Sequence, residues 1–334
     1  MKTFTRSIWQ RWKSFLTVCK QGSPILVYVT LGAGVLMLFS LAMQTIDTRT
    51  VTGAPAWAKP AKFGASVLVT GLSLAWIFSR ITPWSRGMRR AANVFSAMLV
   101  AELLLITFQA ARAVPSHFNT TTITNALIFQ SMGVAITAFW ITQVWLTVKS
   151  FRYRFVDSTI GAGIKLGLLI STLGGGLGFV MTAGPTASQA QAMRLGQASM
   201  VGAHTVGAPD GGPGMPVTRW STVAGDLRVP HFVGLHALQL LPLFAWAMSR
   251  RRQSAGVVNV VGASFGGLVV VTLIQALRGS PLFAPDSLTI GLYVFVFAVM
   301  AAGARAVSRQ KAGSENSTNT RHFGHHTPRE KYGL

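Results

Sequence analysis

Residues 226–252 read DLRVPHFVGLHALQLLPLFAWAMSRRR, and this stretch indicates how the whole chain is built. An acid, an arginine and a proline precede an apolar run, and three consecutive arginines end it. The run is long enough to cross about 30 Å of hydrocarbon as a helix. His231 and His236 lie in its first turns. The stretch therefore predicts a membrane helix with a polar entrance at one end and a basic stop at the other.

The composition of the rest of the chain agrees with a membrane protein. Half of the 334 residues are hydrophobic and only 11% are charged, a balance that soluble domains of this size seldom have. The formal charge of +22 could indicate a nucleic-acid partner. However, the basic residues occur as short clusters between apolar runs and form no continuous face. We therefore expect an all-α integral membrane protein in a lipid bilayer, with no nucleic-acid partner.

Eight apolar runs are long enough to be transmembrane helices. They cover residues 24–44, 63–79, 91–112, 124–148, 159–183, 231–248, 256–277 and 287–307. A cleaved signal peptide is the alternative for the first run, because residues 40–42 read Ser-Leu-Ala. The long basic region before this run, and the length of the run itself, favour a retained span.

The distribution of lysine and arginine predicts the orientation of the spans. The N-terminal arm, residues 80–90, residues 149–154, residues 250–252 and the segment from Arg305 onward hold five, four, three, three and six of them, which is 21 of the 30 in the chain. Because cytoplasmic segments carry the excess of basic residues, we expect both termini to be cytoplasmic.

The spans divide the chain into five parts. They are a basic cytoplasmic arm at 1–23, a first four-helix repeat plus the fifth helix at 24–184, an extracytoplasmic Gly/Pro-rich loop at 185–230, helices six to eight at 231–308, and a polar cytoplasmic tail at 309–334. The arm should lie on the membrane as an amphipathic segment, and the loop should be a mobile cover. The tail should be solvated, although His322, His325 and His326 cluster in it. The single cysteine, Cys19, excludes an internal disulfide and is expected to be an ordinary thiol, with acylation as the alternative.

Two pairs of spans suggest an internal duplication. The spans at 63–79 and 231–248 each open with Lys-Phe or His-Phe and close with Ala-Trp-x-x-Ser-Arg. The spans that follow them end in Gln-Ala-x-Arg at 109–112 and 275–278, and Pro and Phe come next in both. We therefore expect a 4+4 parallel repeat, with four helices repeated in the same orientation and a site at the interface between the repeats.

Charged and polar side chains inside or beside the spans are the candidate site residues, because charge in a bilayer is costly and is usually functional. Glu102 is in the middle of the third span, whereas Lys165 can extend to the inner interface. The remaining candidates lie at the expected outer ends and are Lys62, Arg112, His117, Asp226, His231, His236 and Arg278. The glycines of the fifth span, among them Gly174 and Gly178, favour close helix contact over nucleotide binding.

The segments PSHFN, at 115–119, and HFVGLHALQ, at 231–239, resemble those of uncharacterised multi-pass bacterial inner-membrane proteins. The resemblance covers spans two to eight. It implies a bacterial inner-membrane location and an eight-helix bundle, but it brings no reaction with it.

The sequence favours a protein that binds or transports a small polar or anionic ligand in an outward-facing polar vestibule. Two alternatives remain open. One is a membrane haem or metal redox protein that uses His117, His231 or His236, without thiolate ligands. The other is a scaffold without a small-molecule site. The sequence predicts neither the oligomeric state nor an enzymatic activity.

Overall fold

A computed structural model describes residues 7–81, 84–184, 186–197 and 200–323, and within these residues the chain is helical apart from two very short pairs of antiparallel strands. The elements are α1 (Ile8–Gly22), α2 (Pro24–Ile46), β1 (Thr50–Val51), β2 (Ala54–Pro55), α3 (Ala58–Ser79), α4 (Arg86–Ala111), α5 (Ile123–Arg152), α6 (Ser158–Met181), α7 (Ala187–Arg194), β3 (Thr205–Val206), β4 (Gly225–Asp226), α8 (Arg228–Arg250), α9 (Ala255–Leu277) and α10 (Ser287–Phe323).

Eight of these helices are long and apolar enough to cross a membrane, which confirms the prediction of a polytopic membrane protein. They are α2 to α6, α8, α9 and residues 287–307 of α10. Several helices begin or end in polar residues beyond the apolar run. In particular, α3 starts at Ala58, so Lys59 and Lys62 lie in its first turns and not in the connection before it.

Several spans, α2 and α6 among them, start with sequence-encoded caps. The Ser23 hydroxyl accepts a hydrogen bond from the backbone N–H of Leu26, and Pro24 occupies the first turn of α2, where its missing N–H is tolerated. Asp157 accepts hydrogen bonds from the backbone N–H groups of Thr159 and Ile160 at the start of α6. Such caps define where each span leaves the interface.

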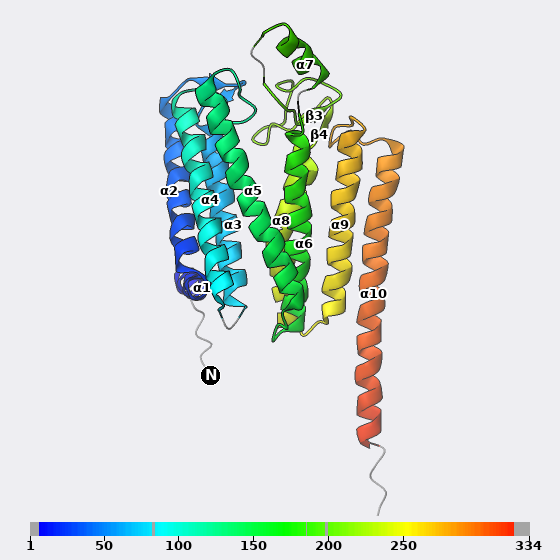
Figure 1. Cartoon of the computed structure of the whole chain (residues 1–334). Coiled ribbons are helices and arrows are strands. Elements are labelled where there is room, and N and C mark those ends of the chain that lie inside the picture. Colours follow the sequence, from blue (N-terminus) through cyan, green and yellow to red (C-terminus); the bar gives the residue numbers. More distant parts are fainter. Residues whose placement is uncertain (1–6, 82–83, 185, 198–199, 324–334) are drawn as a thin grey trace, which may run out of the picture.

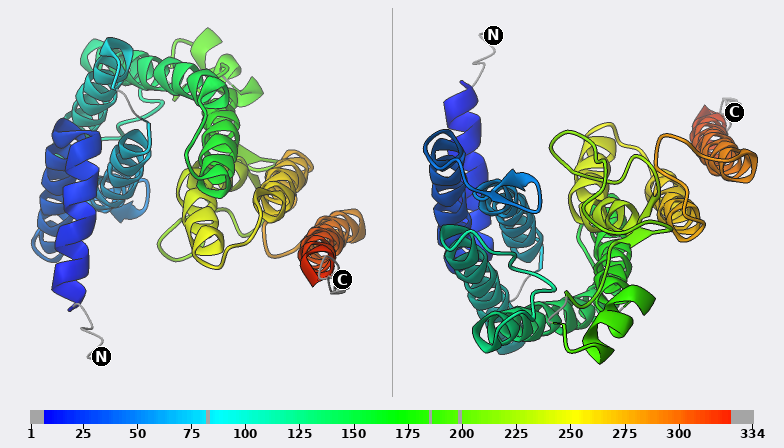
Figure 2. Two further views of the ribbon diagram at one scale, coloured as in Figure 1. Left: turned by 90° about the horizontal axis from the view of Figure 1, so that it is seen from below. Right: turned by 90° about the horizontal axis from the view of Figure 1, so that it is seen from above.

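The helices form two groups joined by α5 (Figures 1 and 2). One group contains α1 to α4, in which α2 packs along α3. The other contains α6, α8, α9 and α10, in which α6 packs along α8. α5 contacts α4 and α6, and it slants from one group to the other (Figure 1). α3 and α8 also contact each other, so the two groups meet at a second place.

Glycines allow a close contact between α6 and α8 in the second group. A Cβ atom added to Gly234 of α8 would lie 2.6 Å from the Cα atom of Gly174 of α6. The two backbones can approach this closely only because neither residue has a side chain. The fifth span therefore uses its glycines for helix contact, as the sequence predicts.

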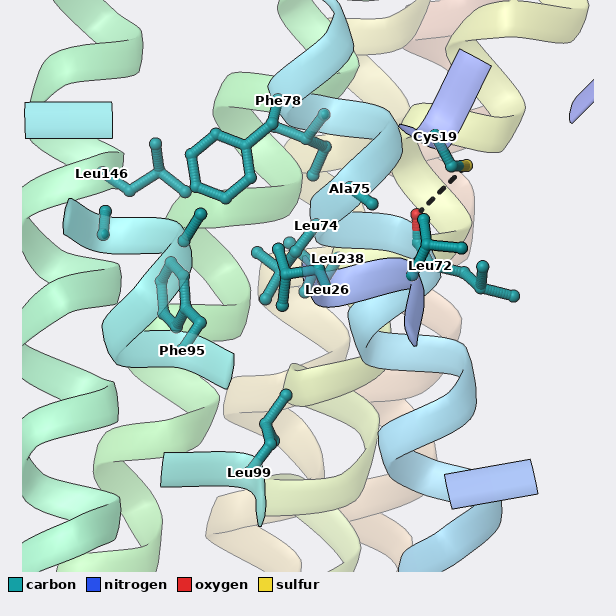
Figure 3. Close-up of a cluster of buried hydrophobic side chains, with 14 of the residues drawn as sticks. Cys19, Leu26, Leu72, Leu74, Ala75, Phe78, Phe95, Leu99, Leu146 and Leu238 are labelled. Atoms are coloured by element: carbon teal, nitrogen blue, oxygen red, sulfur yellow. Dashed lines mark hydrogen bonds between the residues drawn. The ribbon is translucent and has the colours of Figure 1, made fainter. Parts of the chain in front are cut away.

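The N-terminal arm is helix α1, and it packs against α3 and α2. Cys19 is fully buried, and its thiol contacts the backbone oxygen of Leu72 (Figure 3). Burial raises the pKa of this thiol to about 11. Cys19 thus belongs to the hydrophobic core with Leu26 and Phe78 and is not accessible for acylation.

The loop between α6 and α8 has more structure than its composition predicts. It contains α7, and β3 pairs with β4 immediately before α8 begins. The Asp210 carboxylate accepts hydrogen bonds from the backbone N–H groups of His204 and Thr205 and so closes a turn. Local caps and turns stabilise the conformation of this loop, as a large apolar core stabilises other parts of a protein.

The C-terminal segment begins as a continuation of the last span, because α10 extends to Phe323. His325 and His326, which the sequence places in a solvated tail, lie outside the described residues.

Candidate functional site

Most of the predicted site residues lie at one end of the bundle, here called the loop end. This end carries the β1–β2 pair, the α4–α5 connection, the long loop before α8 and the α9–α10 connection (Figure 1). The opposite end, here called the α1 end, carries α1 and the connections at 153–157 and 251–254. The prediction that Lys62, Arg112, His117, Asp226, His231 and Arg278 share one membrane depth therefore agrees with the topology of the helices.

A lysine and a histidine form the centre of the loop end. The Nζ atom of Lys59, in the first turn of α3, lies 3.0 Å from Nδ1 of His117, in the α4–α5 connection. Lys59 can donate this hydrogen bond to Nδ1 of a neutral imidazole. Burial, followed by the positive charge of Lys59, holds the pKa of His117 well below its usual value. Phe63 and Phe129 pack around the imidazole ring.

Glu102 is the acid of this group. It lies in α4, is only 7% exposed, and interacts electrostatically with Lys59. It is nine residues from the last residue of α4, which corresponds to a depth of about 14 Å along the helix. Lys59, on a neighbouring helix, is the basic group that interacts with this buried acid.

The long loop covers this group and links the two helix groups. Lys62 Nζ donates to the backbone oxygen of Val217 at 3.3 Å, and Arg219 Nη2 donates to the backbone oxygen of Gly53 at 3.2 Å. Val217 and Arg219 both have positive φ angles, of 64° and 60°. The loop is therefore held in an uncommon backbone conformation while it contacts α3 and the β1–β2 turn.

Asp226 anchors the end of this loop. It is 3% exposed, and its oxygens accept hydrogen bonds from the Ser221 N–H at 2.8 Å and from Nε and Nη2 of Arg228 at 2.9 and 2.6 Å. Arg228 also donates to the backbone oxygen of Arg219. These hydrogen-bond partners of the Asp226 carboxylate all belong to the protein itself, which favours a structural role for this residue.

His204 lies in the long loop, next to the basic residues Lys59 and Arg228. Its Nδ1 is 3.1 Å from a carboxylate oxygen of Asp210, which favours the protonated ring. Burial, followed by the charge of Arg228, acts in the opposite direction and is the larger effect, so the pKa of His204 is lowered. His204 also interacts electrostatically with Asp226 and Lys59, which places it next to the basic group of α3 and α8.

Arg112 and Arg278, which the sequence places at the outer ends of two spans, both bind side chains close to the ends of their own helices. Arg112 Nη1 donates to Gln109 Oε1 at 2.7 Å and to Asn125 Oδ1 at 3.1 Å. Arg278 pairs with Asp286 at 2.5 Å, and both side chains are partly exposed. The Thr289 hydroxyl and N–H groups and Arg278 hold the pKa of Asp286 at about 2. These contacts fix the α4–α5 and α9–α10 connections.

The two histidines of α8 contact different parts of the protein. His231 Nδ1 lies 2.8 Å from the backbone oxygen of Gly174, so this ring joins α8 to α6. His236 packs edge-on against Phe232, with 4.2 Å between the ring centroids. Among the described residues, no group of three or more His, Cys, Asp or Glu side chains is placed to hold a metal ion.

The structure brings Lys59, His204 and Arg219 into the candidate site, although the sequence reasoning did not select them. Lys59 and Lys62 are three residues apart, as helix neighbours on one face are, and this spacing could have indicated that both face the same group. No comparable signal precedes His204 or Arg219, because their positions depend on how the loop folds. The site is a basic cluster that combines α3 and α4 of one helix group with α8 and the loop of the other.

Comparison of the chain with protein-family models, with curated proteins and with solved structures gives no match.

Proposed function

We propose that this polytopic membrane protein binds and transports a small anionic ligand at the loop end, between two related halves. The observation that carries the proposal is the convergence of Lys59 and Lys62 from α3 with Arg219 and Arg228 from the other side of the α3–α8 contact. Cations that gather at a helix junction repel one another and favour an anion between them.

The charges of the cluster suggest the sign of the ligand charge. Asp226 neutralises Arg228 through two hydrogen bonds. Lys59 and Lys62 interact electrostatically with each other, Lys62 also interacts with Arg219, and Glu102 is the acid that acts on Lys59. The cluster therefore has more basic than acidic groups, which fits an anion. Glu102, below Lys59, is the group through which binding would be coupled to a proton.

Repeated local geometry supports the proposal that the halves are related. Gln109 Nε2 donates to the backbone oxygen of Pro115, and Gln275 Nε2 donates to that of Pro281, six residues further on in both cases. Arg80 lies over the ring of Trp76, at 4.7 Å, as Arg250 lies over that of Trp246, at 5.4 Å. The proposed repeat units are α2 to α5 and α6, α8, α9 and α10. Under this proposal, the α3–α8 contact is the repeat interface, where transport folds commonly place their ligand.

The proposed compartment is a bacterial inner membrane, with the loop end outside and both chain termini in the cytoplasm. The excess of lysine and arginine in the segments of the α1 end supports this orientation. It can be tested with a Cys19→Ala, Gly212→Cys double variant, because Gly212 is exposed on the long loop. A membrane-impermeant maleimide should label this cysteine in intact cells. Labelling only after the cells are opened would reverse the orientation.

Thermal stability in the presence of simple anions tests the function. We expect sodium acetate or pyruvate to raise the apparent Tm of the detergent-purified protein relative to sodium chloride at equal ionic strength. Lys59→Met should abolish this increase, and Glu102→Gln should remove its dependence on pH. Arg194→Gln is the matched control, because Arg194 is exposed on α7 at the same end. An equal response from all four proteins, or from none, would contradict the proposal.

The competing proposal is a scaffold without a ligand. It is supported by the internal hydrogen bonds of Asp226, His231 and Arg112, which use these polar groups to join parts of the protein. In a scaffold, Lys59→Met and Glu102→Gln should lower stability by the same amount with and without the anion, because each leaves a buried partner unpaired.

A further inference from the structure

A second basic cluster lies at the α1 end, far from the candidate site of the loop end. It lines an open cavity of about 430 Å³ where α5 ends and α6 begins. The side chains that matter here are Arg152, Arg154, Phe155, Ser158 and Lys165. We infer that this cavity binds the phosphate headgroup of an anionic lipid in the leaflet at the α1 end.

Three cations face the cavity from two depths. Arg152 ends α5 and Arg154 follows it in the connection, and both are exposed at the level where the helices leave the membrane. Lys165 is seven residues along α6 from Ser158, which places its backbone about 10 Å deeper. Its ammonium group lies over the ring of Phe155, 5.7 Å from the centroid, and so is held at the cavity wall.

The position of Lys165 distinguishes a lipid from a soluble anion. A free phosphate ion needs only the exposed arginines, whereas a lipid places its phosphate at the interface and its chains beside the helices. Phe151, on the last turns of α5, lines the same cavity and is 50% exposed, so apolar surface adjoins the cations. Basic pockets beside spans that combine these features suit anionic headgroups.

The nearby acid is already engaged. Asp157 caps α6 through the N–H groups of Thr159 and Ile160, and it accepts a hydrogen bond from the Ser249 hydroxyl. These hydrogen bonds lower the pKa of Asp157 despite its partial burial, so it is ionised. The negative charge of Asp157 therefore interacts with the start of α6 and with Ser249 of α8. The start of α6 is therefore capped by the protein itself, and the phosphate would be held by Arg152, Arg154 and Lys165.

Native mass spectrometry of the full-length protein in mild detergent tests the inference. We expect phosphatidylglycerol to be retained in preference to phosphatidylcholine of the same chain length. Arg154→Gln and Lys165→Met should each weaken retention about fivefold, which corresponds to about 1 kcal/mol for each interfacial charge. Arg89→Gln is the matched control, because Arg89 is exposed at the same membrane end on α4, and it should leave retention unchanged.

A competition experiment separates the two sources of phosphate. Sodium phosphate, added at the same ionic strength as a sodium chloride control, should not displace phosphatidylglycerol. Displacement by phosphate would show that the cavity recognises the free ion and would overturn the lipid assignment. Equal retention of both lipids, or an equal loss in Arg89→Gln, would also overturn it. An unchanged apparent Tm for each variant in detergent without lipid shows that the comparison concerns folded protein.

Discussion

Replacement of Asp226 by alanine tests whether this acid is structural or binds the ligand. The change removes the acceptor of a buried Ser221 N–H group and of the Arg228 guanidinium, whose side chain is only 27% exposed. Loss of one partner of a buried ion pair costs about 3–5 kcal/mol, and the partial exposure of Arg228 places the expected loss at the lower limit, about 3 kcal/mol. The β3–β4 pair, to which Asp226 belongs, should be weakened as a result.

The chain supplies a matched control for this change. Asp47 accepts hydrogen bonds from the backbone N–H, Nε and Nη2 of Arg49, in the same Asp-x-Arg geometry as Asp226 and Arg228. The Arg49 side chain is 53% exposed, so water can replace Asp47 as its acceptor, and the neutral indole N–H of Trp57, at 2.7 Å, is the one shielded donor that loses its partner. Asp47→Ala should therefore destabilise the protein less than Asp226→Ala does.

The measurement is the apparent Tm of the two full-length variants in detergent, followed by tryptophan fluorescence. At about 2 °C for each kcal/mol in a large domain, Asp226→Ala should lower the Tm by about 6 °C. The increase of this lowered Tm by acetate or pyruvate, relative to sodium chloride, should persist. A variant with the wild-type Tm and no anion response would refute the structural reasoning and would make Asp226 a ligand-binding residue.

Three further predictions follow from the same contacts. The pKa of His117 is lowered in the folded protein, so the unfolded chain binds more protons below about pH 6.5. The stability of the protein should therefore fall as the pH drops from about 8 to about 5. In melting curves of His117→Gln this part of the pH dependence should be absent. Gly234→Val should lower the Tm strongly because its Cβ would lie 2.6 Å from the backbone of Gly174, whereas Gly212→Val, whose Cβ would lie 3.9 Å from the Pro209 oxygen, should leave it unchanged. Cys19 should react with iodoacetamide at pH 8 only after unfolding, since burial raises the pKa of its thiol to about 11, and fast labelling of the native protein would contradict the packing of α1.

The membrane helices could be predicted from the sequence because lipid imposes a simple rule. A span must hydrogen-bond its own backbone and present apolar side chains over about 30 Å, so length and hydropathy are sufficient. All eight predicted runs correspond to helices of the structure that can cross a membrane. The small deviations occur at the ends, as in α3, because Lys59 and Lys62 can stay helical at the interface.

The candidate site could be predicted only in part, because side chains at a helix end have several possible partners. Lys59 has the position of an ordinary interface anchor, and only the fold of the α4–α5 connection brings His117 to 3.0 Å from it. His231 has the position of a vestibule residue, yet its ring reaches the Gly174 oxygen because the glycine contact brings α6 close to α8. Local sequence predicts which depth a residue occupies, but the partner depends on the packing of other helices.

The long loop connects the proposed ligand site to the relative position of the two halves. It continues into α8, yet its contacts through Val217 and Arg219 are with Lys62 and Gly53 of the first helix group. α3 and α8 meet over a shorter length than α6 and α8 do, so the loop contacts form a substantial part of the link between the halves at this end. Each is a single hydrogen bond at an exposed side chain, and such bonds contribute about 1 kcal/mol. Movement of one half against the other would break these two bonds before it disturbed either helix core. An anion bound to Lys62 would compete with the Val217 oxygen for the same ammonium group. Under the proposed function, ligand binding and release of the loop would thus be linked through Lys62, which is the coupling that a transport cycle requires and a scaffold does not.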